Sequence, residues 1–111
     1  MPLHITVQRE ADMVIVALTG ELDLDTAPGL HEQLAELLAD GCRRFVFDLT
    51  EMPFCDSTGL SEFIQIKKAC DELGGDVRLA RPPRAVRRVL ELSGVTDALP
   101  IFASLDEALA A

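Results

Sequence analysis

Residues 43–73 read RRFVFDLTEMPFCDSTGLSEFIQIKKACDEL, and this stretch indicates the fold class most clearly. Its first part, RRFVFDL (43–49), is an apolar run of the length of a β-strand. Its last part, LSEFIQIKKACDEL (60–73), has helical spacing of the apolar residues Leu60, Phe63, Ile64, Cys70 and Leu73. A buried strand followed by an amphipathic helix is the repeating unit of α/β folds, so the stretch predicts an α/β protein.

The sequence before this unit predicts two strands and a helix. Leu3, Ile5 and Val7 alternate with polar residues, as in an edge strand, and MVIVALTGEL (13–22) is apolar enough for a central strand. In DTAPGLHEQLAELLADG (25–41) the leucines recur at i, i+4, i+7 and i+8, which indicates a helix. We expect Asp25 or Thr26 to cap this helix and Gly41 to end it.

The sequence after the unit continues the alternation. DVRLA (76–80) predicts a strand, and a helix should follow from Pro82–Pro83 to Gly94. LPIFAS (99–104) predicts a last strand, and SLDEALAA (104–111) a terminal helix capped by Ser104. We therefore expect one domain over residues 1–111, with a mixed, mostly parallel sheet of about five strands covered by about four helices. The first two strands, joined only by Ala11-Asp12, should be antiparallel.

Composition excludes several functions. The net charge of −9 repels nucleic acid, and the lack of Trp and Tyr argues against a stacking platform for bases. The N-terminus lacks a signal-peptide pattern, and MVIVAL (13–18) is too short to insert into a membrane, so we expect a cytoplasmic protein. Cys42, Cys55 and Cys70 are too far apart for a CxxC pair, and we expect free thiols and no metal site.

The segment DSTG (56–59) has two interpretations. Structurally, Asp56 or Ser57 caps the following helix. However, a cap needs one oxygen-bearing residue and here there are three in succession, while Gly59 costs about 1 kcal/mol relative to Ala in a helix. That cost suggests a close approach to the backbone at this point. A helix N-terminus with exposed hydroxyl groups also suits a phosphate.

A catalytic role for this segment is not supported. Ser57 lacks a G-x-S-x-G context and a nearby His, and a strand-end turn explains the carboxylates of Glu21, Asp23 and Asp25. We therefore expect no enzyme activity. What remains for Ser57 is the role of a substrate, a hydroxyl that another enzyme phosphorylates.

Three segments carry a resemblance to a known family. GELDLDTAPGL (20–30), FVFDLTEMPFCDSTGL (45–60) and VRRVLELSGV (86–95), in this order and spacing, resemble a STAS domain of the anti-sigma factor antagonist type over nearly the whole chain. The resemblance implies that Ser57 is the phosphorylation site, with Thr58 as the alternative hydroxyl. Cys55 replaces the aliphatic residue common before the Asp, which leaves the partner's identity and a redox-sensing role for Cys55 open.

The resemblance also implies a partner-switching cycle. The unphosphorylated protein binds an anti-sigma factor that is also a serine kinase, and so releases a sigma factor. The kinase, which holds the ATP, phosphorylates Ser57 and ends the association, and a phosphatase resets the cycle. This chain then needs no cofactor. The residues expected at the partner-binding surface are Asp23, Leu24, Thr26, Asp56, Thr58, Gly59 and Leu60, with Glu62 as a weaker candidate on the exposed side of its helix.

Two further alternatives remain open. STAS domains also serve transporters, so the chain is alternatively an accessory subunit that docks on a membrane transporter ATPase. Arg81, Arg84, Arg87 and Arg88 concentrate positive charge in an acidic chain. They either meet an acidic partner or form a solvated helix face, which is the simpler interpretation.

Overall fold

The structure is a computed structural model that describes residues 2–111. Within these residues the main sheet has five strands in the order β1-β2-β4-β6-β7. Their bounds are β1 His4–Glu10, β2 Met13–Thr19, β4 Arg44–Asp48, β6 Asp76–Ala80 and β7 Ile101–Phe102. β1 runs antiparallel to β2 and all other neighbours are parallel, which confirms the predicted mixed sheet. Two short segments, β3 (Glu21–Leu22) and β5 (Phe54–Cys55), form a separate parallel pair.

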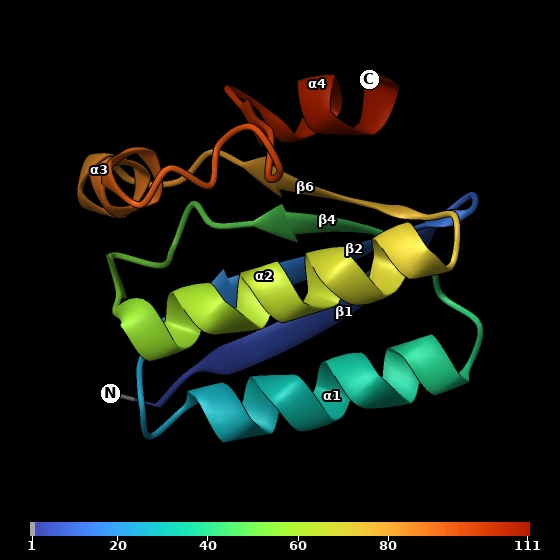
Figure 1. Cartoon of the computed structure of the whole chain (residues 1–111), viewed down its shortest axis with the longest axis horizontal. Helices are drawn as coiled ribbons and strands as arrows, with labels where there is room; N and C mark the ends of the chain where they lie inside the picture. Colours follow the sequence, from blue (N-terminus) through green and yellow to red (C-terminus); the bar gives the residue numbers. More distant parts are fainter. Residues whose placement is uncertain (1) are drawn as a thin grey trace.

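Helices cover both faces of the sheet. Their bounds are α1 Ala27–Ala39, α2 Ser57–Glu72, α3 Arg84–Leu92 and α4 Leu105–Ala110. α1 and α2 lie side by side across one face (Figure 1), and the apolar side of α3 joins the same core. Ala108 of α4 packs on the opposite face with Met13, Val46 and Ala80. Because alternate strand residues point to opposite faces, the central strands are apolar on both sides.

The predicted strand 13–22 is in fact two strands. Gly20 has a φ of +115°, and a Cβ there would lie 2.4 Å from the carbonyl oxygen of Pro2. The chain therefore turns at Gly20, and residues 21–22 leave the main sheet to pair with β5. This turn brings the loop before α1 next to the DSTG segment.

The helix ends agree only in part with the predictions. Asp56 and Ser104 cap α2 and α4 through their side chains, and Gly41, with a φ of +98°, follows the end of α1. Thr26 occupies the predicted N-cap position of α1, but its side chain makes no hydrogen bond to the helix. Its hydroxyl instead donates to the carbonyl oxygen of Glu21 at 2.8 Å.

Candidate functional site

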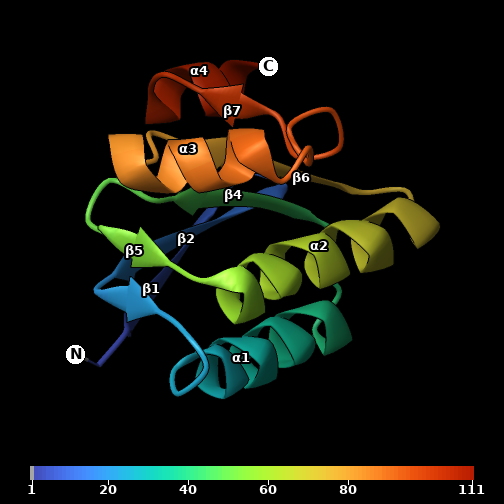
Figure 2. The same ribbon diagram turned by 60° about the vertical axis from the view of Figure 1, so that its left-hand side comes forward.

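The candidate site lies at the carboxyl ends of the parallel strands, where two loops meet. Leu22 of β3 pairs with Cys55 of β5, and the amide of Asp56 donates to the carbonyl oxygen of Leu22 at 3.1 Å. These backbone contacts place the loop 23–26 beside the N-terminus of α2 (Figure 2). The site is therefore built from segments about thirty residues apart in sequence, as is usual at this edge of an α/β sheet.

Ser57 is the first residue of α2 and is exposed. The capping function belongs to its neighbour, because Asp56 Oδ1 accepts a hydrogen bond from the Gly59 amide at 2.9 Å. Ser57 Oγ makes no hydrogen bond within the described part of the chain. The hydroxyl group is thus presented to solvent at a helix N-terminus, while the adjacent Thr58 is half-buried.

A glycine is required at position 59 because of packing within the chain itself. A Cβ at this position would lie 2.6 Å from Leu22 Cγ and 2.8 Å from the Leu22 carbonyl oxygen. The close approach that the sequence suggests is therefore the chain's own β3 segment. Gly59 and Leu60 are both buried, so they support the surface from below instead of forming it.

The loop 23–26 is held by its own side chains. Asp23 Oδ1 accepts hydrogen bonds from the amides of Asp25 at 3.0 Å and Thr26 at 3.1 Å. Thr26 Oγ1 in turn accepts from the Asp23 amide at 2.9 Å. Asp23 and Thr26 thus fix the loop, and the residues left for a partner are Asp25, which is exposed, and Leu24, which is 69% exposed.

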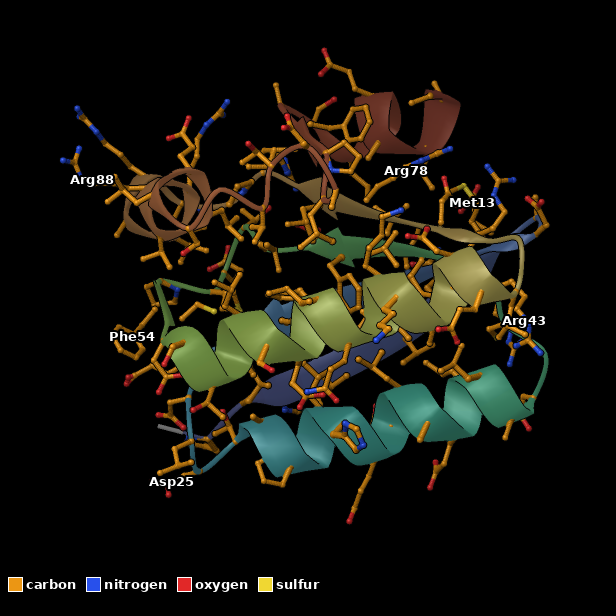
Figure 3. All side chains as sticks on the ribbon, viewed as in Figure 1. Met13, Asp25, Arg43, Phe54, Arg78 and Arg88 are labelled. Carbon is orange, nitrogen blue, oxygen red and sulfur yellow. The ribbon has the colours of Figure 1, made fainter. Side chains whose placement is uncertain are left out.

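Phe54 is a surface residue that sequence reasoning missed. It lies on β5, is 49% exposed and sits at the same end of the molecule as Asp25 (Figure 3). The signal available in the sequence was that this aromatic residue belongs neither to the apolar strand nor to the apolar stripe of the helix, which indicates a position outside the core. Phe54 and Leu24 are two of the few large apolar side chains left exposed, and such residues often serve as anchors at interfaces.

The prediction that Glu62 lies on the exposed side of its helix is wrong. Glu62 is 8% exposed, and its Oε1 lies 2.9 Å from Nδ1 of His31 on α1. The reason is that α1 packs alongside this face of α2, which a single helix pattern does not show. The two helices border a mostly apolar groove of about 270 Å³, and Glu62 lies in its wall.

The three cysteines are free, as predicted, and all three are buried. Burial, assisted by the Asp56 carboxylate, raises the pKa of Cys55 to about 12. Because the thiolate is the reactive form, this environment opposes redox sensing at Cys55. Within residues 2–111 no cluster of His, Cys, Asp or Glu suits a metal ion, and no helix is long and apolar enough to cross a bilayer.

Comparison with known proteins identifies the family. A family model described as the STAS domain matches residues 4–108, so the chain belongs to the STAS-domain family. It is 30% identical over 103 residues to an anti-sigma F factor antagonist of Paenibacillus polymyxa, covering 92% of this chain and 88% of that protein. It is 28% identical to an anti-sigma-B factor antagonist of Bacillus subtilis (strain 168), covering 93% and 94%.

A solved structure is similar over nearly its full length. A crystal structure of an anti-sigma factor antagonist from Thermotoga maritima superposes with a TM-score of 0.92 at 25% sequence identity, covering 96% of this chain and 92% of that chain. The sheet order and helix positions described above are thus those of the family.

Proposed function

We propose that this chain is an anti-sigma factor antagonist controlled by phosphorylation at Ser57. Its unphosphorylated form binds an anti-sigma factor that is also a serine kinase, and this binding releases a sigma factor. The kinase uses its own bound ATP to phosphorylate Ser57, which ends the association, and a phosphatase restores the hydroxyl group. The descriptions of the relatives support the general role, and the geometry around Ser57 supports the switch.

The observation that carries the proposal is the free hydroxyl of Ser57. Asp56 satisfies the helix cap, so phosphorylation of Ser57 removes no hydrogen bond of the fold. A phosphate adds roughly −1.5 to −2 charge at neutral pH. At a helix N-terminus this charge is favourable by about 0.3–1 kcal/mol. Phosphorylation therefore changes the surface around Ser57, where the partner is expected to bind, and leaves the domain folded.

The residues around Ser57 explain how a phosphate on this serine would end the binding of the partner. Phe54 and Asp56 precede Ser57 in the chain, and the loop that carries Leu24 and Asp25 follows β3, which pairs with β5 and hydrogen-bonds to the Asp56 amide. We expect the apolar pair to enter a pocket of the kinase and the carboxylates to face its basic groups. A phosphate between them adds bulk, must be desolvated, and turns a moderately acidic surface into a strongly acidic one.

Affinity capture from the native cell tests the proposal. Wild type, Ser57→Ala and Ser57→Asp serve as baits, and mass spectrometry maps phosphate on the wild-type protein. We expect wild type and Ser57→Ala to recover a kinase-like anti-sigma factor and Ser57→Asp to lose it. Phosphate should map to Ser57 and not to Thr58.

Ser61→Asp is the matched control, because Ser61 lies one helical turn further along α2 and the substitution adds the same charge. It should retain the partner. Recovery of a transporter ATPase by every bait, irrespective of Ser57, would contradict the proposal and favour the accessory-subunit function.

A further inference from the structure

Helix α3 carries positive charge that the domain leaves largely unpaired. Arg84, Arg87 and Arg88 are exposed on α3 and Arg81 precedes it, in a chain with ten Lys and Arg residues and a net charge of −9. Arg84 and Arg88 have no hydrogen bond or ion pair within residues 2–111. Arg87 lies 3.8 Å from Glu91 and Arg81 lies 3.7 Å from Asp48, and both of these contacts are long. Arg44 and Arg78, by contrast, are engaged by the carboxylate of Asp76.

The order of charges on α3 opposes helix stability. The N-terminus of a helix favours acidic residues and the C-terminus favours basic ones. In α3 the first residue is Arg84, no acidic residue lies in the first turn, and Glu91 lies in the last turn. α4 shows the favourable order, with Asp106 and Glu107 in its first turn. The arginines of α3 are therefore not explained by stabilisation of their own helix.

The helix that carries these arginines lies next to the candidate site. Val86 and Leu90 anchor α3 in the core, and α3 packs beside β5, which leads directly into Asp56 and Ser57 (Figure 2). Arg88 extends away from the body of the molecule (Figure 3). Leu92 follows Arg88 by one helical turn and is 76% exposed, so it extends the same stripe. We call Arg84, Arg87, Arg88 and Leu92 the arginine face.

We infer that the arginine face is a second docking surface, which binds an acidic segment of the same protein partner that engages Ser57; this inference rests on the proposed function. Guanidinium groups bind carboxylates in a planar, two-pronged geometry, and exposed Arg beside an apolar residue is typical of protein interfaces. Arg88, Phe54 and Asp25 follow one another along the same end of the molecule, so the basic α3 and the acidic loop at Asp25 lie on opposite sides of Phe54 (Figure 3). A partner with the opposite pair of charges docks in one orientation only, which places its active site at Ser57.

An acidic protein segment fits this arrangement better than a nucleic acid or a membrane. A duplex or an anionic bilayer presents negative charge over a wide area, so contact with α3 would also press phosphates towards Asp25 and Asp56. The net charge of −9 repels such surfaces at a distance. A protein can place acidic and basic groups side by side and so match both halves.

A pair of charge-reversal variants tests the inference. Arg84→Glu/Arg88→Glu alters the arginine face, and Arg9→Glu/Lys68→Glu is the matched control, since Arg9 and Lys68 are exposed, have no bonded partner in residues 2–111, and lie on β1 and α2. Both variants change the net charge equally. With the purified anti-sigma kinase, calorimetry should show at least a tenfold loss of affinity for the first and less than a twofold change for the second.

Stability measurements guard against a folding artefact. Arg84→Glu places an acid at the start of α3, so the melting temperature should stay the same or rise while binding falls. Equal affinities of the two double variants, with binding still abolished by Ser57→Asp, would overturn the arginine face and leave the proposed function standing.

A second probe tests the affinity of the arginine face for an acidic segment without the kinase, so its outcome is separate from that of the proposed function. A synthetic peptide of alternating Glu and Leu is titrated against the isotopically labelled protein. Chemical-shift changes of amide groups that are confined to residues 84–92, and that are absent in Arg84→Glu/Arg88→Glu, support the arginine face as a docking surface. No shifts there, or Arg84-dependent binding to phosphatidylserine vesicles or to a DNA duplex instead, would overturn it.

Discussion

At Gly59 a methyl group would have no room. Its Cβ would meet both the side chain and the carbonyl oxygen of Leu22, and a backbone atom cannot move aside without displacing β3. We expect Gly59→Ala to lower the free energy of unfolding by about 1–3 kcal/mol. Urea denaturation measures this loss.

Gly29→Ala is the control for that substitution. Gly29 lies in α1, and no atom lies within 4 Å of a Cβ built there. Alanine should stabilise this helix by about 0.5–1 kcal/mol. If both substitutions had the same sign, the close approach at Leu22 would not be the reason for Gly59.

The thiol of Cys55 provides a pH-dependent prediction. Burial raises its pKa from 9.0 to about 12, so the folded protein holds this proton more tightly than the unfolded chain does. The stabilisation is fully present below pH 9 and is lost as the pH rises from 9 towards 12. Unfolding free energies over this range should fall, and Cys55→Ala should remove part of the decline.

Thiol labelling checks the same residue independently. At pH 8 iodoacetamide should modify Cys55 in the folded protein far more slowly than in denaturant, because the thiolate is the nucleophile. Rapid native-state labelling at Cys55 would contradict the buried thiol and reopen a redox role.

At the scale of elements, α1 and α2 are joined by one polar contact in a mostly apolar interface. The side chain of Glu62 is only 11% exposed and that of His31 is 57% exposed, so the carboxylate depends on the imidazole for its buried hydrogen bond. A double-mutant cycle with His31→Ala and Glu62→Ala should give a coupling energy of about 0.5–1.5 kcal/mol.

An exposed ion pair supplies the comparison. Lys67 and Asp71 lie at i and i+4 on α2, 2.5 Å apart, with Asp71 53% exposed. Their cycle should give only about 0.3–0.5 kcal/mol. Coupling of His31 with Glu62 no larger than this would show that the pair does not bind α1 to α2.

The β3–β5 pair shows why elements of two residues matter to the site. It is too short for any periodic pattern, yet its register places Leu22 against Cys55 and fixes the loop 23–26 beside Ser57. The sequence therefore predicted the residues of this surface better than their roles. Three residues hold this surface in place, namely Asp23, Thr26 and Gly59. Three others are exposed on it, namely Leu24, Phe54 and Ser57.

For the whole molecule, we predict that the fold survives the phosphorylation of Ser57. The phosphate gains from the helix N-terminus and loses by repulsion from nearby carboxylates, so the melting temperature should change by less than about 4 °C, the equivalent of about 1 kcal/mol. Calorimetry of the phosphorylated protein measures the shift. Loss of folded structure on phosphorylation would contradict it.

Ser93→Asp places a negative charge at the C-terminal end of a helix, in contrast to a charge at Ser57, which lies at an N-terminus. Ser93 is the C-cap of α3, where a negative charge faces the negative end of the helix dipole. This substitution should destabilise the protein by about 0.3–1 kcal/mol, whereas Ser57→Asp should be neutral or slightly stabilising. The reverse order would contradict the helix-dipole argument.

The amino-acid sequence alone was sufficient to predict the order of the main elements, the mixed sheet and a helix cap at Asp56 or Ser57. These follow from apolar periodicity and from hydrogen bonding between near neighbours, which a local stretch of chain fully contains. The resemblance over three motifs is what suggested Ser57 as the phosphorylation site.

The residues that face outward at the site became apparent from the three-dimensional packing, not from the sequence. Gly59 is required by Leu22, Glu62 is buried by α1, and Phe54 remains exposed because β5 pairs with the short β3. Each of these outcomes depends on a contact between segments some thirty residues apart. Such contacts are set by how the helices and strands pack on one another, and no local pattern encodes that packing.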